Sequence, residues 1–391
     1  MKIVSVVLVG VGGYGAKICK NILDNALAYN VEVVGVVEYN LDASPMKENI
    51  LVQNIPVYTH LEDFYAEHKA DLAIICTPIP FHQSHSIIAM KNGSHVLCEK
   101  PTAATLAQSD SMAAAAEKYG KHLNIGFQLC YMDSILALKR DVLAGDLGKH
   151  LCMSALICWP RTSEYYSRAW CAKRKWNGQL VLDSIAMNAC AHYLNLMFFL
   201  GGKTMETTAE PVSAEAILTR ANDIETYDTA IIQSFTKDYE MRLLSTHVCG
   251  RRINPIMKFS FEKADVYFKE SASEDAVKVV FHDGRVKLYG RTNNYSKLPY
   301  CFDIARGLKS PICTPATARA HLKLVNAVTE KVPVLTVTDK IVVDDVVVVP
   351  GMDDLLEQAY QENKLPWDMT DRFGAPAKID LTTYEGWYED L

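Results

Sequence analysis

The amino-acid sequence predicts an α/β protein of two domains. Residues 1–127 are expected to form a doubly wound parallel sheet, and residues 128–391 a second α/β domain with a large, mostly antiparallel open sheet. Three observations predict this division. The 391 residues exceed what one hydrophobic core usually organises. Strand-like and helix-like segments alternate up to residue 127, whereas strand-like runs follow one another after about residue 150.

The first domain contains six short apolar segments that are typical of buried strands. Residues 3–10 (IVSVVLVG) are almost continuously apolar, as expected for a parallel strand covered on both faces. Helical segments, including 82–91 and the alanine-rich 103–119, separate the six segments. Such alternation implies right-handed crossovers and therefore one parallel sheet. The other five strand-like segments are 31–38, 55–58, 71–76, 95–98 and 122–127.

The second domain shows a different pattern, in which strand-like runs are joined by short connections. The sequence HDG at 282–284 lies between two alternating runs and indicates a β-hairpin, because Asp-Gly favours a tight turn. Helical segments are expected at about 183–200, 314–330 and 351–363. The strand-like runs are 150–159, 215–220, 228–235, 240–248, 256–268 and 276–290.

Composition excludes several classes of protein. The net charge of −6 provides no basic surface for nucleic acid. No apolar run reaches the 18 or more residues of a membrane span, and the N-terminal MKIVSVVLVGVGG reads as a strand rather than a signal peptide. The eleven cysteines are widely spaced without a C-x-x-C, which is typical of reduced thiols in a cytoplasmic protein.

A glycine-rich segment lies between the first strand and the first helix. Glycines there permit a tight turn and let backbone amides approach a pyrophosphate at the helix N-terminus, so we expect a Rossmann dinucleotide site. Glu38 ends the second strand at the spacing expected for the acid that binds ribose hydroxyls. Its charge would repel a 2′-phosphate, which favours NAD over NADP. The segment is Gly10, Val11, Gly12, Gly13, Tyr14 and Gly15, a G-x-G-x-x-G pattern.

Two further segments follow strands of the same predicted sheet and should reach its ligand-binding edge. Thr77 and Pro78 follow the fourth strand, and His82 opens the next helix. Glu99 and Lys100 follow the fifth strand, ahead of a proline. A lysine in a partly dry cleft beside a cationic nicotinamide would have its charged form disfavoured, which suits proton exchange with a hydroxyl. A metal site at His82 is not expected, because no third ligand is near.

Together these segments resemble a known family. GVGGYG, the run from TPIPFHQSH to VLCEKP, and GFQLCYM are similar to the glucose–fructose oxidoreductase, inositol dehydrogenase and rhizopine-catabolism family of NAD(P)-dependent oxidoreductases. LAGDLGKH and NACAHYLNLMFFLGG extend the resemblance past residue 200, whereas the last sixty residues match only loosely. The resemblance implies reversible oxidation of a secondary hydroxyl of a sugar, sugar acid or cyclitol, with hydride passing to NAD. It also implies a homodimer or homotetramer, paired through the outer face of the second sheet.

The resemblance also implies roles for individual residues. Lys100 would bind the reacting hydroxyl and form an acid–base pair with His192, while Glu99 helps to hold the nicotinamide. His192 matches the family's Asp-x-x-x-His helix, but Asn188 stands at the Asp position. Asp183 is expected on another face of that helix. Cys130 and Asn195 depart from the Arg and Asp that many members carry. The remaining cofactor contacts implied are Thr77, Pro78, His82 and Gln128.

The segment 164–178 (EYYSRAWCAKRKWNG) concentrates aromatic and basic residues just before the His192 helix. Sugar rings stack on aromatic side chains, and cationic groups bind hydroxyls or an acidic substituent. We therefore expect Tyr165, Arg168 and Trp170, together with Asn188, to contact the substrate. The alternative is an exposed loop or a contact between subunits.

Three other functions stay open on the sequence. The first is an NAD-dependent glycosidase that oxidises its sugar only transiently. The second is a reductase of a non-sugar substrate such as a dihydrodiol or an imine. The third is a regulator that senses a dinucleotide or a sugar without turnover. Family members of the third kind tend to lose the E-K-P sequence, which this chain retains at 99–101.

Overall fold

The computed structural model describes residues 2–269, 277–290 and 293–386. It contains two compact units. The first comprises Met1–Tyr131 and Tyr295–Ala318, and the second comprises Met132–Asn294 and Arg319–Leu391. The end of the first segment lies close to the boundary expected at residue 127. Residues 295–318 also belong to the first unit, whereas the sequence-based division placed them in the second domain.

The first unit is built on a parallel sheet of six strands in the order β3-β2-β1-β4-β5-β6. The strand order reverses between β1 and β4, which is the position where doubly wound sheets bind ligands. In the register, Val9 is opposite both Val37 and Ile75, so these strands end at the same level. The predicted fold is confirmed for this unit. The strands are β1 Val4–Val9, β2 Val31–Val37, β3 Val57–Tyr58, β4 Leu72–Ile75, β5 His95–Cys98 and β6 Leu123–Ile125.

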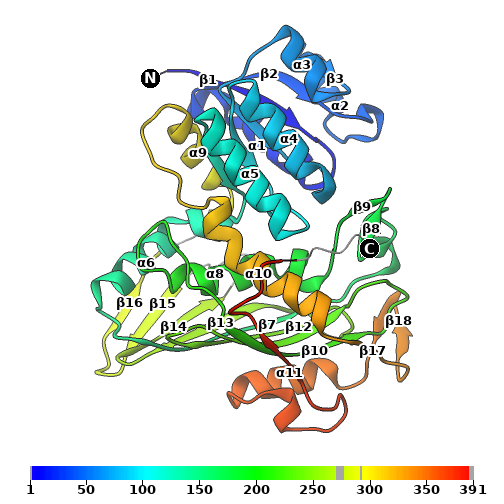
Figure 1. Cartoon of the computed structure of the whole chain (residues 1–391), viewed down its shortest axis with the longest axis vertical. Helices are drawn as coiled ribbons and strands as arrows, with labels where there is room; N and C mark the ends of the chain where they lie inside the picture. The colour runs from blue at the N-terminus through cyan, green and yellow to red at the C-terminus, as the bar shows by residue number, and fades with distance from the viewer. Residues whose placement is uncertain (1, 270–276, 291–292, 387–391) are drawn as a thin grey trace. The chain divides into compact units, whose positions relative to one another are not determined.

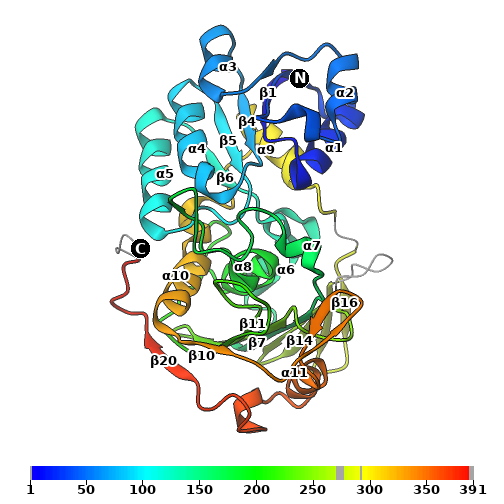
Figure 2. The same ribbon diagram turned by 90° about the vertical axis from the view of Figure 1, so that its right-hand side faces the viewer.

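Helices cover both faces of this sheet, with α4 and α5 on one side and α1 on the other (Figure 2). The helix expected at 103–119 begins at Leu106, because Thr105 and Gln108 form a reciprocal capping box. The short helix α2 was not expected from the sequence. The helices are α1 Gly13–Tyr29, α2 Lys47–Val52, α3 Leu61–Glu67, α4 His82–Lys91, α5 Leu106–Tyr119 and α9 Lys297–Ala305, with 3-10 turns at Leu41–Ala43, Ile79–Phe81 and Gln128–Tyr131.

The second unit is built on a ten-stranded sheet in the order β16-β15-β14-β13-β7-β12-β11-β10-β17, with β20 also paired to β10. Among the described strand pairs of this sheet, only β7–β12 and β10–β17 are parallel, which confirms a mostly antiparallel sheet. The hairpin expected at 282–284 is present between β15 and β16. Residue 276, which the sequence placed in this strand, lies outside the described residues.

The bounds of these strands are β7 His150–Cys158, β10 Ser213–Arg220, β11 Thr229–Phe235, β12 Glu240–Thr246, β13 Ile253–Phe261, β14 Ala264–Lys269, β15 Val277–Phe281, β16 Val286–Leu288, β17 Val334–Thr336 and β20 Ala377–Asp380. Two small hairpins are formed by β8 Lys175–Trp176 with β9 Gln179–Leu180, and by β18 Ile341–Val343 with β19 Val346–Val348.

Helices lie on both faces of the large sheet as well. Figures 1 and 2 show α8 and α10 on one face and α11 on the opposite, outer face. Helix α8 is almost entirely buried, which agrees with its apolar sequence. The helices are α6 Asp133–Ala144, α7 Ser163–Tyr166, α8 Ala191–Leu200, α10 Pro315–Lys331 and α11 Met352–Gln361, with a π-helical turn at Ile185–Ala189 and a 3-10 turn at Pro366–Asp368.

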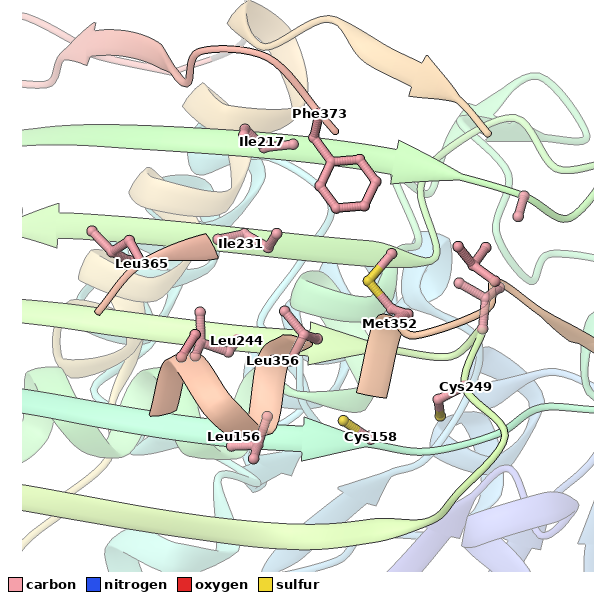
Figure 3. Packing of buried hydrophobic residues seen from close by; sticks show 14 residues of the cluster. Leu156, Cys158, Ile217, Ile231, Leu244, Cys249, Met352, Leu356, Leu365 and Phe373 are labelled. Carbon is pink, nitrogen blue, oxygen red and sulfur yellow. The ribbon is translucent and has the colours of Figure 1, made fainter. Parts of the chain in front are cut away.

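The segment around α11 covers the apolar half of the outer sheet face (Figure 3). Met352 and Leu356 of α11 pack against strand residues such as Leu244, and all three are buried. Toward β13 and β14 the same face becomes polar, with Lys258 and Asp265 forming an ion pair of 3.3 Å. The chain therefore supplies its own cover for the part of this face that would otherwise expose apolar side chains.

All eleven cysteines lie within the described residues, and each is a free thiol. None of the helices in the described ranges combines the length and the apolar character needed to cross a bilayer.

Candidate functional site

The glycine-rich turn after β1 has the geometry of an anion cradle. Gly10 has φ +85°, and a Cβ there would lie 3.0 Å from the Cys76 carbonyl carbon. A Cβ on Gly15 would lie 2.2 Å from the Gly10 oxygen, so α1 packs directly on the turn. By contrast, a Cβ on Gly12 or Gly13 would meet no atom of the described residues within 4 Å. Backbone amides at the start of α1 therefore border open space, which fits a dinucleotide pyrophosphate.

Glu38, directly after β2, is fixed beside this turn. Its Oε2 accepts a hydrogen bond of 2.8 Å from the Val11 amide, and its Oε1 accepts one of 3.1 Å from the Asn40 amide. Ser44 holds the other side of the turn by donating to the Val11 carbonyl at 2.8 Å. Both carboxylate oxygens thus lie at the edge where β2 ends. Val11 therefore contributes to the site through its backbone amide, which donates to Glu38.

His82 joins the loop after β4 to the segment after β5. Its Nδ1 lies 2.9 Å from the Pro101 carbonyl and its Nε2 2.9 Å from the Thr77 carbonyl. Burial lowers the pKa of His82, so the ring is neutral and donates to one of these carbonyls at a time. Thr77 also contacts Nδ1 of His85 at 3.3 Å, and burial lowers the pKa of that ring to about 4. In the first unit, His82 and His85 therefore hold backbone and side-chain groups of the Thr77–Pro78 loop.

A buried polar chain connects Glu99 to the glycine turn through Lys297, at the start of α9. Lys297 donates to Oε1 of Glu99 and lies 3.3 Å from the Tyr14 hydroxyl, which donates to Oε1 of Gln128 at 3.2 Å. The exposed fractions of the Lys297 and Glu99 side chains are 0% and 9%. Burial alone would lower the pKa of Lys297, but Glu99 and Tyr14 raise it above the ordinary value, so Lys297 keeps its positive charge.

Lys297 was not predicted from the sequence, whereas Glu99, Tyr14 and Gln128 were predicted to contact the cofactor. A lysine in the apolar stretch KLPYCFDIA was the available signal, because a buried lysine requires a partner. Burial raises the pKa of Tyr14 to about 12, so its hydroxyl stays protonated. Gly126 leaves room for this arrangement, because a Cβ there would lie 2.8 Å from the Glu99 carboxylate. The backbone amide of Lys100 lies 3.4 Å from the same carboxylate.

The second unit holds Asn188 and His192, and its backbone corrects one prediction. Asp183 was expected on another face of a continuous helix, but Oδ1 of Asp183 accepts a hydrogen bond of 2.9 Å from Asn188. The expectation is wrong because Asp183 precedes the helical residues, and residues 185–189 form a π-helical turn ahead of α8. Burial raises the pKa of Asp183, although hydrogen bonds from Ala172 and Asn188 oppose this.

His192 lies in the first turn of α8, after the π-helical turn has ended at Ala189. The one-face relation of residues four apart in a regular α-helix therefore does not apply to 188 and 192. His192 is partly buried and packs edge-on against Tyr193, with ring centroids 6.5 Å apart. Cys130 and Asn195, the two other departures from the family pattern, are fully buried.

The aromatic and basic residues of 164–178 are brought together around Tyr165. The Arg168 guanidinium carbon lies 4.1 Å from the Tyr165 ring centre and 5.0 Å from that of Trp170. Two residues that were not predicted join them, Arg161 at 4.7 Å and His247 at 5.4 Å from the same Tyr165 ring. We call Arg161, Tyr165, Tyr166, Arg168, Trp170 and His247 the Tyr165 cluster.

A separate pocket of about 440 Å³ lies in the second unit between α10 and the strand that follows it. Its walls carry mainly polar groups, including Arg174, Arg220 and Glu225. Arg220 donates hydrogen bonds to the carbonyls of Ile224 and Glu225, and these bonds fix the wall of the pocket. It contains none of the predicted site residues. Within the described ranges there is also no group of three or more His, Cys, Asp or Glu side chains arranged to bind a metal ion.

Comparison with known proteins agrees with the geometry of the first unit. Residues 4–127 match the oxidoreductase family with an NAD-binding Rossmann fold. The match is confined to the Rossmann part of the chain, and it agrees with the resemblance inferred from the sequence. The NAD-binding character expected from the glycine turn is confirmed with it.

Individual relatives match over shorter stretches. D-glucoside 3-dehydrogenase of Escherichia coli (strain K12) is 37% identical over 81 residues, which are 21% of this chain and 23% of the relative. The 2,7-anhydro-N-acetylneuraminate hydratase of Mediterraneibacter gnavus is 25% identical over 211 residues, which are 53% of this chain and 52% of the relative. The chain thus matches between about a quarter and half of the length of these curated relatives.

Among solved structures, the WlbA dehydrogenase from Bordetella pertussis in complex with NADH and UDP-GlcNAcA has a similar fold. The TM-score is 0.66 at 20% sequence identity, and the match covers 83% of this chain and 94% of that chain. At this identity the similarity concerns the fold, and it extends beyond the Rossmann domain into the second unit.

Proposed function

We propose that the protein is an NAD-dependent oxidoreductase that reversibly oxidises a secondary hydroxyl of a sugar, sugar acid or cyclitol. One observation carries this proposal. The open glycine turn, Glu38 and the Glu99–Lys100 pair all follow strands that end at one edge of a sheet belonging to an NAD-binding oxidoreductase family. A dinucleotide laid along such an edge has its phosphates at the turn and its nicotinamide near the later strands.

The residues of the first unit fit the cofactor in three ways. The backbone amides of Gly12 and Gly13 would hold the pyrophosphate, because the space before α1 is open there. Glu38, already fixed by two backbone amides, would accept hydrogen bonds from the ribose hydroxyls. The loop with Thr77 and Pro78, held by His82, borders the same edge. When bound, the nicotinamide supplies the acceptor for the substrate's hydride.

Lys100 is proposed to bind the reacting hydroxyl and to exchange its proton. Lys297 supports this role. Its buried ammonium group neutralises the carboxylate of Glu99, the residue next to Lys100, so that carboxylate is already paired with another lysine. We further propose, from the family resemblance, that His192 acts with Lys100 as an acid–base pair. Asn188, Tyr165, Arg168 and Trp170 are proposed to position the substrate.

We also propose that the protein works as a homo-oligomer in the cytoplasm. The family resemblance placed subunit pairing on the outer face of the large sheet. The apolar half of that face is already covered by Met352, Leu356 and the residues around them. We therefore expect any subunit contact to use another surface, including the polar part of the face around Lys258.

A second candidate is a redox-neutral reaction in which NAD is reduced and reoxidised within one turnover. The relative with a match over 53% of this chain is named a hydratase, and adding water involves no net oxidation. Transient oxidation next to a leaving group would make elimination and hydration feasible on the same site. This candidate retains the roles proposed for Lys100 and the glycine turn.

The test is a panel of cyclitols, hexoses, sugar acids and glycosides, each supplied with NAD or NADP and followed at the absorbance of reduced nicotinamide. The first candidate predicts accumulation of reduced cofactor with at least one compound. The second predicts consumption of substrate with no accumulation, which product analysis would detect.

Lys100→Ala is run beside the wild type, with Lys91→Ala as the control at an exposed lysine of the same unit. Lys100→Ala should lose turnover on every active compound and bind NAD with nearly unchanged affinity, while Lys91→Ala should resemble the wild type. A Lys100→Ala enzyme that reacts at the parental rate would refute the role of Lys100.

A further inference from the structure

The Tyr165 cluster concentrates positive charge without matching carboxylates. The guanidinium groups of Arg161 and Arg168 both lie against the Tyr165 ring, at 4.7 and 4.1 Å from its centre. Arg168 donates to the Tyr165 carbonyl and to the Cys171 sulfur. Nε of Arg161 is buried and has no hydrogen-bond partner among the described residues. Two like charges beside one ring repel each other, and a bound anion would offset that repulsion.

Three acidic side chains near the cluster, Asp183, Asp228 and Asp345, accept hydrogen bonds from other groups. Asp183 accepts hydrogen bonds from the Ala172 amide and from Asn188. Asp228 accepts from the amides of Ala221 and Asn222 and from the Asn222 side chain. Both carboxylates therefore accept hydrogen bonds from backbone amides and from asparagine side chains.

The third carboxylate, Asp345, accepts from the amide and the hydroxyl of Ser163. This contact fixes the short stretch between Arg161 and Tyr165 to the β18–β19 hairpin, so the arginine is held in place by the fold. None of the three acids is hydrogen-bonded to Arg161 in the described part of the chain.

His247 adds a second polar group with one ring nitrogen that is not hydrogen-bonded within the described residues. The residue is 3% exposed, and its Nδ1 lies 3.2 Å from the Tyr166 hydroxyl. Its Nε2 is buried and has no hydrogen-bond partner within the ranges that the structure describes. Burial, with the nearby charges of Arg161 and Arg168, holds the pKa of His247 well below its usual value. The neutral ring can therefore donate one hydrogen bond to a ligand oxygen when Tyr166 donates to Nδ1.

We infer that the Tyr165 cluster is a subsite for an anionic oxygen group, a carboxylate or a phosphate, carried by the sugar-type ligand. Arg161 supplies the planar donors that match two oxygens of such a group, and His247 supplies a further hydrogen bond. Trp170, which lies beside Arg168, offers apolar surface to the adjoining ring of the ligand. The choice of a sugar rests on the proposed function, whereas the preference for an anion rests on the cluster alone.

The test measures binding to the full-length protein by isothermal titration calorimetry, in the absence of NAD. Three probes of one ring skeleton are compared: glucuronate carries a carboxylate, glucose 6-phosphate carries a phosphate, and glucose is neutral. At least one of the two anions should bind ten or more times more tightly than glucose, and the tighter one identifies the group. Raising the salt concentration should weaken the anion and leave glucose unchanged.

Variants separate the arginine from a general effect on folding. Arg161→Gln should weaken binding of the preferred anion tenfold or more and leave glucose unaffected. Arg161→Lys should recover part of the loss, because it restores the charge without the planar donors. Arg285→Gln, at an exposed arginine paired with Asp283 in the same unit, is the matched control and should change neither affinity. Circular dichroism of each variant checks the fold.

Three results would overturn the inference: equal binding of glucose and both anions, no binding of either anion, or unchanged anion binding in Arg161→Gln. Because the assay uses neither NAD nor turnover, it is independent of the proposed reaction. Anion binding that depends on Arg161 would stand even if no compound in the oxidation panel reacted. Oxidation of neutral sugars together with no binding of either anion would leave the reaction intact and remove the subsite.

Discussion

The buried ion pair of Lys297 and Glu99 makes the sharpest prediction about stability. In Lys297→Met the methionine fills similar volume, but the Glu99 carboxylate loses its cationic partner. The two side chains are 0% and 9% exposed, so solvent screens the pair very little. Removing one partner of such a pair usually costs about 3–5 kcal/mol, because the other charge stays buried and unpaired. The hydrogen bond from Lys297 to the Tyr14 hydroxyl is lost as well.

The assay is equilibrium unfolding in urea, followed by far-UV circular dichroism. All five tryptophans lie between positions 159 and 387, outside the first unit, so their fluorescence records the second unit separately. With a loss of ~3 kcal/mol and a urea slope of ~2 kcal/mol/M, the midpoint of the first unit should fall by about 1.5 M. Lys297→Met combined with Glu99→Gln should recover much of this loss, because the unpaired charge is gone.

Lys20→Met is the control, since Lys20 forms an exposed ion pair with Asp24 and should change the free energy of unfolding by less than about 0.5 kcal/mol. The reasoning would be refuted if Lys297→Met unfolded at the wild-type urea concentration. It would also be refuted if the double variant were less stable than the single one.

Three further outcomes are expected. The deficit of Lys297→Met should be equal at pH 7 and pH 9. The pKa of Lys297 is raised in the folded state, so its contribution to the free energy of unfolding is complete below its unfolded pKa of about 10.4 and declines only as the pH rises through the folded pKa. A stability deficit that shrinks by pH 9 in urea titrations would contradict this. Gly15→Ala should destabilise the chain in thermal unfolding because its Cβ would meet a carbonyl, whereas Gly12→Ala should unfold normally yet bind NAD more weakly by calorimetry; equal stability of the two would be inconsistent with the turn. Leu356→Asp should lower the melting temperature and promote self-association in light scattering, because it places a charge in the buried cluster under α11. Gln358→Asp, at an exposed position of the same helix, should do neither. If Leu356→Asp left both the melting temperature and the monomer–oligomer balance unchanged, α11 would not cover the sheet face as described.

The first unit follows its sequence closely for a physical reason. Strands buried on both faces read as continuous apolar runs, and parallel strands joined by helices have one allowed handedness. The glycine pattern could be interpreted because each glycine meets a different steric demand, closed at Gly10 and Gly15 and open at Gly12. The short helix α2 carries no such pattern, and the sequence did not indicate it.

Features that depend on distant or irregular contacts could not be predicted. Lys297 is 198 positions from Glu99, and local periodicity carries no information on such a pair. Asp183 was assigned to a regular helix because a π-helical turn has no sequence signature, so its hydrogen bond to Asn188 was missed. The helix at 351–363 was expected and corresponds to α11, but its pattern did not reveal which sheet face it covers.

The most direct test of the account is a calorimetric titration of the full-length wild type with NAD and, separately, with NADP. The open glycine turn predicts one NAD per chain. The Glu38 carboxylate, fixed beside that turn by Val11 and Asn40, predicts that NADP binds at least about tenfold more weakly, a difference of ~1.4 kcal/mol. Failure of both nucleotides to bind, or tighter binding of NADP, would contradict the account.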